Sequence, residues 1–170
     1  MSTNKFLTFF NNAQRLVDAI VSSAGVADAF KIIATGSDGL ISSSLMPTGI
    51  GADTRTAIAF EAIGAGDWVN FFDVAGVLNV RGADADNNRP ANGFVLASVA
   101  AAATALVFKS GTNTGKSGLT IGAYYYLSTT TGSQSTSAPA LSGNNLIQGL
   151  GYAVSATAIA FQPAPVIIAV

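Results

Sequence analysis

The stretch Asp67-Trp-Val-Asn-Phe-Phe-Asp-Val-Ala-Gly-Val-Leu-Asn-Val-Arg81 consists of two runs rich in β-branched and aromatic residues on either side of a glycine. Runs of this length and composition are typical of β-strands, and a glycine between them favours a tight turn. We therefore predict a hairpin, with strands at 67–74 and 77–81 and a turn at Gly76. Short apolar runs separated by turn residues continue through most of the chain after Arg55.

The segments on either side of this hairpin predict an all-β domain. We expect strands over 56–63 and 119–127, further hairpins from 93–99 with 104–109 and from 146–155 with 157–162, and polar loops at 84–92 and 129–143. The alanines at 97–105 also favour a helix, which leaves that segment open. Tyr124 and Tyr126 should lie on one face of their strand and Tyr125 on the other, because side chains alternate along a strand. Strands at this spacing predict a small antiparallel β-barrel or sandwich over 55–170.

A helical periodicity marks the N-terminal segment. Apolar residues recur at i, i+3, i+4 and i+7 between residues 4 and 24, and Gly25 is placed to end a helix. We predict an N-terminal helix followed by an extended arm through the Gly- and Ser-rich segment 35–51, with a domain boundary between residues 54 and 55. The helix either packs on its own domain or docks on another subunit or protein. The candidate capsid- or subunit-contact residues are Phe6, Phe9, Phe10, Leu16, Ile20, Leu45, Met46 and Pro47.

The composition of the 170 residues excludes several kinds of chemistry. There is no cysteine and no histidine, which excludes disulfides, zinc sites of Cys and His ligands, cysteine nucleophiles and catalysis by histidine. Charged residues make up only 10%, the net charge is −1, and no charged side chain follows Lys116. This charge argues against nucleic acid as a partner. So few surface charges indicate either a membrane-embedded chain or one that is packed against other proteins.

The membrane alternative can be tested on the sequence itself. The longest uncharged stretch with a membrane-like composition covers residues 90–108, and its apolar part, residues 94–108, includes Ser98 and Thr104. A membrane-spanning helix needs about 20 strongly apolar residues, so we expect no membrane partner. Polar residues between positions 11 and 18 interrupt any signal-peptide core, and we expect that the chain does not follow the ordinary secretory route.

One segment resembles a phosphate-binding loop. It is Ser110-Gly-Thr-Asn-Thr-Gly-Lys-Ser117, in which Ser110 stands where that motif has its first glycine. The motif needs a helix after it to direct backbone N–H groups at the phosphates, and the residues that follow here are β-branched and aromatic. We therefore expect a polar loop or hairpin in this segment.

A second motif has the spacing of a cation-binding loop. Asp84, Asp86 and Asn88 match the opening of a calcium loop, but Arg89 and Val95 stand where an EF-hand has Gly and Glu. We expect a solvated loop, with a weak cation site as the alternative.

Aromatic residues give a third candidate site. Trp68 together with Tyr124, Tyr125 and Tyr126 is a candidate platform for a sugar, although such aromatics more often pack in a core. One glutamate and scattered aspartates give no positive signal for a catalytic carboxylate pair. We therefore expect no enzyme activity, no cofactor and no metal.

Several segments resemble structural proteins of tailed phages. They are Lys31–Thr54, Gly66–Asn70, Ala91–Ala97, Gly118–Ser128 and Gln148–Ser155. The nearest group is the capsid decoration, or cement, proteins, which are small, β-rich and often trimeric on the outer face of an assembled head. Where such proteins often have Leu-Thr-Pro-Gly, this chain has Leu119-Thr-Ile-Gly122. The N-terminal segment lies outside the resemblance.

The resemblance implies a structural virion protein with two partners, the major capsid protein and itself, in a homotrimer. It would lie on the capsid surface, and in the host cytoplasm during assembly. The alternative is a phage tail or fibre component whose β-domain recognises a host glycan. Binding to empty heads favours the first function, and binding to cells or glycans favours the second.

The missing histidine and cysteine also predict how stability responds to pH. Almost no unperturbed side chain in this chain titrates between about pH 5 and 8. We therefore expect thermal stability to be nearly flat from about pH 6 to 9.

Overall fold

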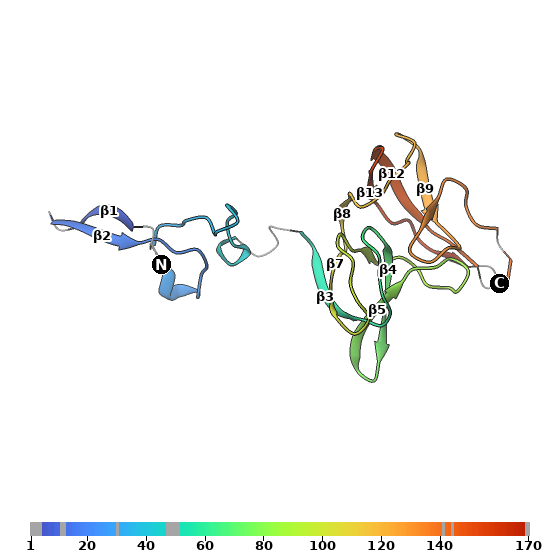
Figure 1. The fold of residues 1–170 in the computed structure, drawn as a ribbon, viewed down its shortest axis with the longest axis horizontal. Helices are drawn as coiled ribbons and strands as arrows, with labels where there is room; N and C mark the ends of the chain where they lie inside the picture. The colour runs from blue at the N-terminus through green and yellow to red at the C-terminus, as the bar shows by residue number, and fades with distance from the viewer. Residues whose placement is uncertain are drawn as a thin grey trace. The chain divides into compact units, whose positions relative to one another are not determined.

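The structure is a computed structural model that describes residues 5–10, 13–29, 31–46, 52–140, 142–143 and 145–168. The chain divides into two compact units, which we call unit 1 (Met1–Gly51) and unit 2 (Ala52–Val170). Its secondary structure is almost entirely β, and the described part contains no α-helix (Figure 1). The prediction of a mainly β chain with a small barrel is confirmed. The prediction of an N-terminal helix is wrong.

Unit 1 begins with an antiparallel hairpin in place of the predicted helix. Strand β1 (Lys5–Phe10) pairs with β2 (Ala13–Asp18), and the register sets Leu7 opposite Leu16. Aromatic and β-branched residues favour strands, and this preference outweighs the helical spacing.

The rest of unit 1 is held by sparse backbone contacts. It contains two single-turn 3₁₀ helices, η1 (Val26–Asp28) and η2 (Ser43–Leu45). The Ile20 N–H donates to the Ile32 carbonyl, and the Ala34 N–H donates to the Ile20 carbonyl, each over 2.9 Å. These bonds form an isolated parallel bridge, and no larger sheet is built on it in the described part of this unit.

The first half of unit 2 is a closed five-stranded barrel in the order β3-β5-β4-β6-β7. Its strands are β3 (Thr54–Ala59), β4 (Trp68–Val74), β5 (Val77–Gly82), β6 (Gly93–Phe94) and β7 (Thr104–Phe108). β4 and β5 form the predicted hairpin, with Ala75 and Gly76 both at positive φ in its turn. The pair β3–β5 is parallel and the other pairs are antiparallel. The prediction of a purely antiparallel barrel is therefore wrong for this one pair.

The second half of unit 2 is a five-stranded antiparallel sheet in the order β10-β9-β12-β13-β8, with a separate pair β11–β14 (Figure 1). The strands are β8 (Gly111–Asn113), β9 (Tyr124–Leu127), β10 (Gln134–Ser135), β11 (Leu146–Ile147), β12 (Gly149–Ser155), β13 (Ala158–Phe161) and β14 (Ile167–Ile168). β12 and β13 form the predicted third hairpin. The segment predicted as a loop at 129–143 contributes the short edge strand β10.

Two groups of buried side chains hold unit 2 together. Small side chains fill the barrel, among them Ala57, Ala105 and Val107. A larger group joins the barrel to the five-stranded sheet around the fully buried Trp68. The Trp68 ring lies 5.1 Å from the Phe161 ring between centroids. The barrel and the sheet therefore share one packed core.

Candidate functional site

The described part of unit 1 is rich in exposed apolar side chains. Among the side chains that the structure describes between Lys5 and Met46, none is buried. Its exposed large apolar side chains are Phe6, Leu7, Leu16, Val21, Val26, Ile32, Ile33, Leu40, Ile41 and Met46. A lone two-stranded hairpin is marginally stable at best in water. Apolar surface on such a segment is typical of a site that binds another protein.

The predicted contact residues belong to this surface or its neighbourhood. Phe6, Leu16 and Met46 are exposed, and Ile20 and Leu45 are half-buried. For Phe9 and Phe10 the structure describes the backbone but not the side chains. Pro47 lies outside the described residues. The prediction missed Leu7, which is 60% exposed opposite Leu16, itself 66% exposed. Leu7 does not belong to the apolar positions of the predicted helix, so only the strand pairing identifies it as part of this surface.

The segment that resembles a phosphate-binding loop packs against the barrel instead. A β-carbon on Gly66 would overlap the carbonyl oxygen of Gly115, so the two backbones cross in close contact. The fully buried Asn113 completes the contact: its Nδ2 donates to the Gly66 carbonyl over 2.8 Å, and its Oδ1 accepts from the Gly115 N–H over 3.2 Å. The segment is therefore a joint between the barrel and the five-stranded sheet.

Lys116 follows this joint and lies over the Trp68 ring, with Nζ 5.1 Å from the ring centroid. Its Nζ donates to the Gly132 carbonyl over 3.3 Å. Burial lowers the pKa of Lys116 to about 8, against the opposing effect of the Asp67 carboxylate. Burial also raises the pKa of Asp67, partly offset by the hydrogen bond from the Gly64 N–H. An amine with a pKa near 8 favours a stability that changes with pH above about pH 8, where the composition predicts a flat profile.

Asp84 organises the predicted polar loop from a buried position. Its carboxylate accepts hydrogen bonds from the Asp86 N–H over 2.9 Å, and from Asn87 Nδ2 and Thr131 Oγ1 over 2.8 Å each. The backbones of Asp84 and Arg89 exchange two further bonds of 2.9 Å. Within the described ranges, no three His, Cys, Asp or Glu side chains gather as a metal site. The geometry favours a loop scaffold, in which protein donors already use this carboxylate.

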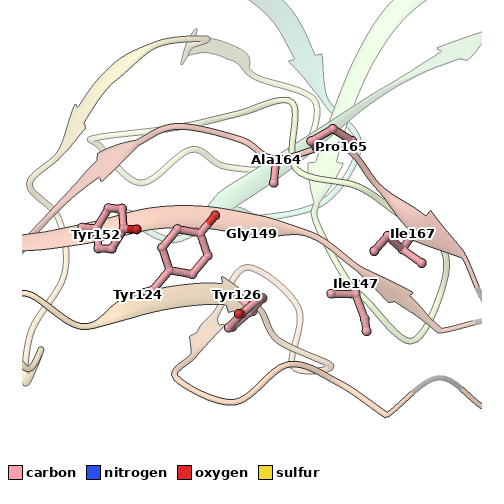
Figure 2. Close-up of a pocket in the computed structure, with 8 residues that line it drawn as sticks. All are labelled: Tyr124, Tyr126, Ile147, Gly149, Tyr152, Ala164, Pro165 and Ile167. Atoms are coloured by element: carbon pink, nitrogen blue, oxygen red, sulfur yellow. The ribbon is translucent and has the colours of Figure 1, made fainter.

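A hollow of about 580 Å³ lies on the face of the five-stranded sheet that is turned away from the core (Figure 2). It is lined by Tyr124, Tyr126, Ile147, Gly149, Tyr152, Ala164, Pro165 and Ile167. The Tyr124 ring lies between those of Tyr126 and Tyr152, at centroid distances of 5.2 and 4.7 Å and with ring planes inclined by 70° and 74°. Burial, together with the neighbouring phenols of Tyr126 and Tyr152, raises the pKa of Tyr124.

The predicted sugar platform is therefore divided between this hollow and the core. Tyr124 and Tyr126 line the hollow, whereas Tyr125 and Trp68 are buried on the other side of the sheet or in the barrel joint. The predicted alternation of the three tyrosines is confirmed. Tyr152 was not among the candidates, because only the pairing of β12 with β9 sets it opposite Tyr124.

Comparison of the chain with protein-family models, with curated proteins and with solved structures finds no match. Within the part of the chain that the structure describes, no helix has the length and apolar character to cross a membrane. The resemblance to phage cement proteins stays a prediction.

Proposed function

We propose that the chain is a structural, non-enzymatic virion protein that decorates the outer face of a phage capsid. In this proposal it binds the major capsid protein, assembles with itself as a homotrimer, and occupies the host cytoplasm before it joins the capsid. The observation that carries the proposal is the contrast between a well-packed unit 2 and an apolar unit 1 without a buried side chain among those described. The resemblance of segments between residues 31 and 155 to cement proteins supports the same assignment.

Unit 1 is the docking element of this proposal. Fully burying a leucine contributes about 1.5–3 kcal/mol. Leu7 and Leu16 are largely exposed in the free chain, so most of this free energy is still available when they bind a partner. Ordering the unit and losing rotational and translational freedom offset much of it. One unit 1 therefore binds weakly. Three on a trimer gain about 10²–10⁴ in avidity if they can engage together, which suits a protein that ties neighbouring capsid subunits.

The charges of unit 1 favour recognition by apolar contact. The unit has three basic residues (Lys5, Arg15 and Lys31) and three acidic ones (Asp18, Asp28 and Asp38), so its net charge is zero. Lys5 pairs with Asp18 over 3.5 Å and Lys31 with Asp28 over 2.6 Å, within the unit itself. We therefore expect that capsid binding changes little with added salt, in contrast to binding steered by charge.

The test uses heads purified from a phage that lacks the gene for this chain. We compare the full chain with the double variant Leu7→Ser/Leu16→Ser, and the matched control is Ile121→Ser, which alters an equally exposed residue of unit 2. Losing two leucine contacts should weaken head binding by about 100-fold, while the control binds normally. Thermal unfolding should be the same in all three, because neither change touches the core.

Three results would each reject a part of the proposal. Heads that do not bind the unaltered chain would reject capsid decoration, and normal binding by the double variant would move the docking surface out of unit 1. Sedimentation of the unaltered chain as a monomer at micromolar concentration would reject the trimer.

A further inference from the structure

We propose that the hollow formed by Tyr124, Tyr126 and Tyr152 binds a neutral saccharide. This activity goes beyond capsid decoration and does not depend on it: on a capsid surface the hollow would provide contact with polysaccharide, and in a free protein it would bind in the same way.

The strand pairing builds the hollow. Tyr152 of β12 stands opposite Tyr124 of β9, and Gly149 stands opposite Tyr126. A β-carbon on Gly149 would overlap the Tyr124 hydroxyl and lie 2.8 Å from two atoms of its ring, so the glycine is what lets this ring lie across β12. Figure 2 shows the three rings in a row along the two strands, with Ala164 and Pro165 across from them.

The dimensions and the walls suit a small ligand. A hollow of about 580 Å³ is within the usual range of about 300–1,000 Å³ for ligand sites, which are mostly apolar with a few polar groups. Tyr152 is 52% exposed, so its ring is accessible at one end.

The chemistry of the walls selects a sugar. Aromatic faces carry partial negative charge and attract the polarised C–H groups on the face of a pyranose ring. The phenol hydroxyls donate to and accept from sugar hydroxyls. Tyr125 uses its hydroxyl to accept from the Thr120 N–H over 2.9 Å, whereas within the described residues the hydroxyls of the three hollow tyrosines have no such partner.

The charge of the site selects a neutral sugar. None of the residues that line the hollow is charged, and no charged side chain follows Lys116 in the sequence. An acidic or amino sugar would bring a charge to walls that offer it no counter-ion, which costs free energy as that charge loses water. An uncharged hexose or N-acetylhexosamine meets no such penalty.

The experiment titrates the full chain with neutral hexasaccharides of glucose, mannose, galactose and N-acetylglucosamine, measured by calorimetry and by saturation-transfer NMR. We expect saturable binding of at least one of them. Tyr152→Ala should weaken it by about tenfold or more, because a stacking wall is lost, and Tyr152→Phe should retain most of it. The matched control is Val154→Ala, which alters an exposed residue of the same strand outside the hollow.

The outcomes are decisive in either direction. Failure of all four saccharides to bind overturns the proposal, and so does binding that Tyr152→Ala leaves unchanged. If Tyr152→Ala alters the sedimentation of the protein and no saccharide binds, the hollow is a protein interface instead. Should Tyr152→Ala unfold the chain, Tyr126→Ala removes the opposite wall and is read in the same way. None of these results bears on head binding through unit 1, so either proposal can be rejected without affecting the other.

Discussion

Gly66 and Gly115 lie backbone against backbone, so that a β-carbon on Gly115 would lie 2.6 Å from the α-carbon of Gly66. Gly66 precedes β4 of the barrel, and Gly115 follows β8 of the five-stranded sheet. The buried Asn113 bridges the same two backbones, so this crossing links the two halves of unit 2. Side chains at either glycine would force the halves apart.

Replacing Gly115 by alanine should therefore destabilise unit 2 by about 3 kcal/mol, because a backbone has to shift. Gly118→Ala is the matched control: Gly118 has a φ of +66° and open space around it, so alanine there meets only backbone strain, about 1 kcal/mol. Gly66→Ala, with a φ of +81° as well as the overlap, should cost the most. Urea unfolding measures all three. A Gly115→Ala loss no greater than that of Gly118→Ala would show that the halves can separate freely.

A buried amide supplies a second prediction. Gln148 Oε1 accepts from the Ala91 N–H over 2.7 Å, and its Nε2 donates to the Ala91 carbonyl over 2.9 Å. Gln148→Glu replaces the donor by a carboxylate facing a carbonyl, and should cost about 2–4 kcal/mol at pH 7. Protonation restores a donor, so the loss should shrink as the pH falls toward 4. Gln162→Glu, at an exposed position, should change the urea midpoint little at either pH.

Lys116 predicts a rise in stability at alkaline pH. In the folded chain its amine loses a proton from about pH 8, whereas in the unfolded chain it holds that proton to about pH 10.4. Between these values the unfolded state binds more protons, so the free energy of unfolding should rise with pH, by up to about 3 kcal/mol. Lys116→Met should remove this rise, so the difference between the two proteins isolates the contribution of the amine. Parallel stability curves from pH 7 to 10.5 would contradict the lowered pKa.

The Asp84 loop predicts that calcium has no effect on folding. Asp84→Ala removes three accepted hydrogen bonds from a buried loop and should cost about 2–3 kcal/mol. Asp86→Ala, at an exposed position, should cost little. Millimolar Ca²⁺ should leave the melting temperature of all three proteins unchanged. A calcium-dependent rise that both variants abolish would establish the weak cation site instead.

Local patterns in the sequence were enough to predict the β-class, the hairpin at 67–81, the hairpin of β12 and β13, and the alternation of Tyr124 and Tyr125 about their strand. Each of these depends on residues that are neighbours in the chain, because strand propensity, turn residues and side-chain alternation act over a few positions. At the N-terminus a local pattern gave a wrong prediction. The apolar spacing there suits a helix, but the residues at those positions also favour strands, and they form the hairpin of β1 and β2.

The features that define the candidate sites come from pairings between distant segments. The parallel pairing of β3 with β5, the crossing of Gly66 and Gly115, and the position of Tyr152 opposite Tyr124 each join segments that are well separated in the chain. The lowered pKa of Lys116 likewise follows from its burial over Trp68. Composition alone excluded histidine chemistry. The packing of the whole unit decides which side chains lie together and which lose contact with water, because the burial of a residue depends on every element that surrounds it.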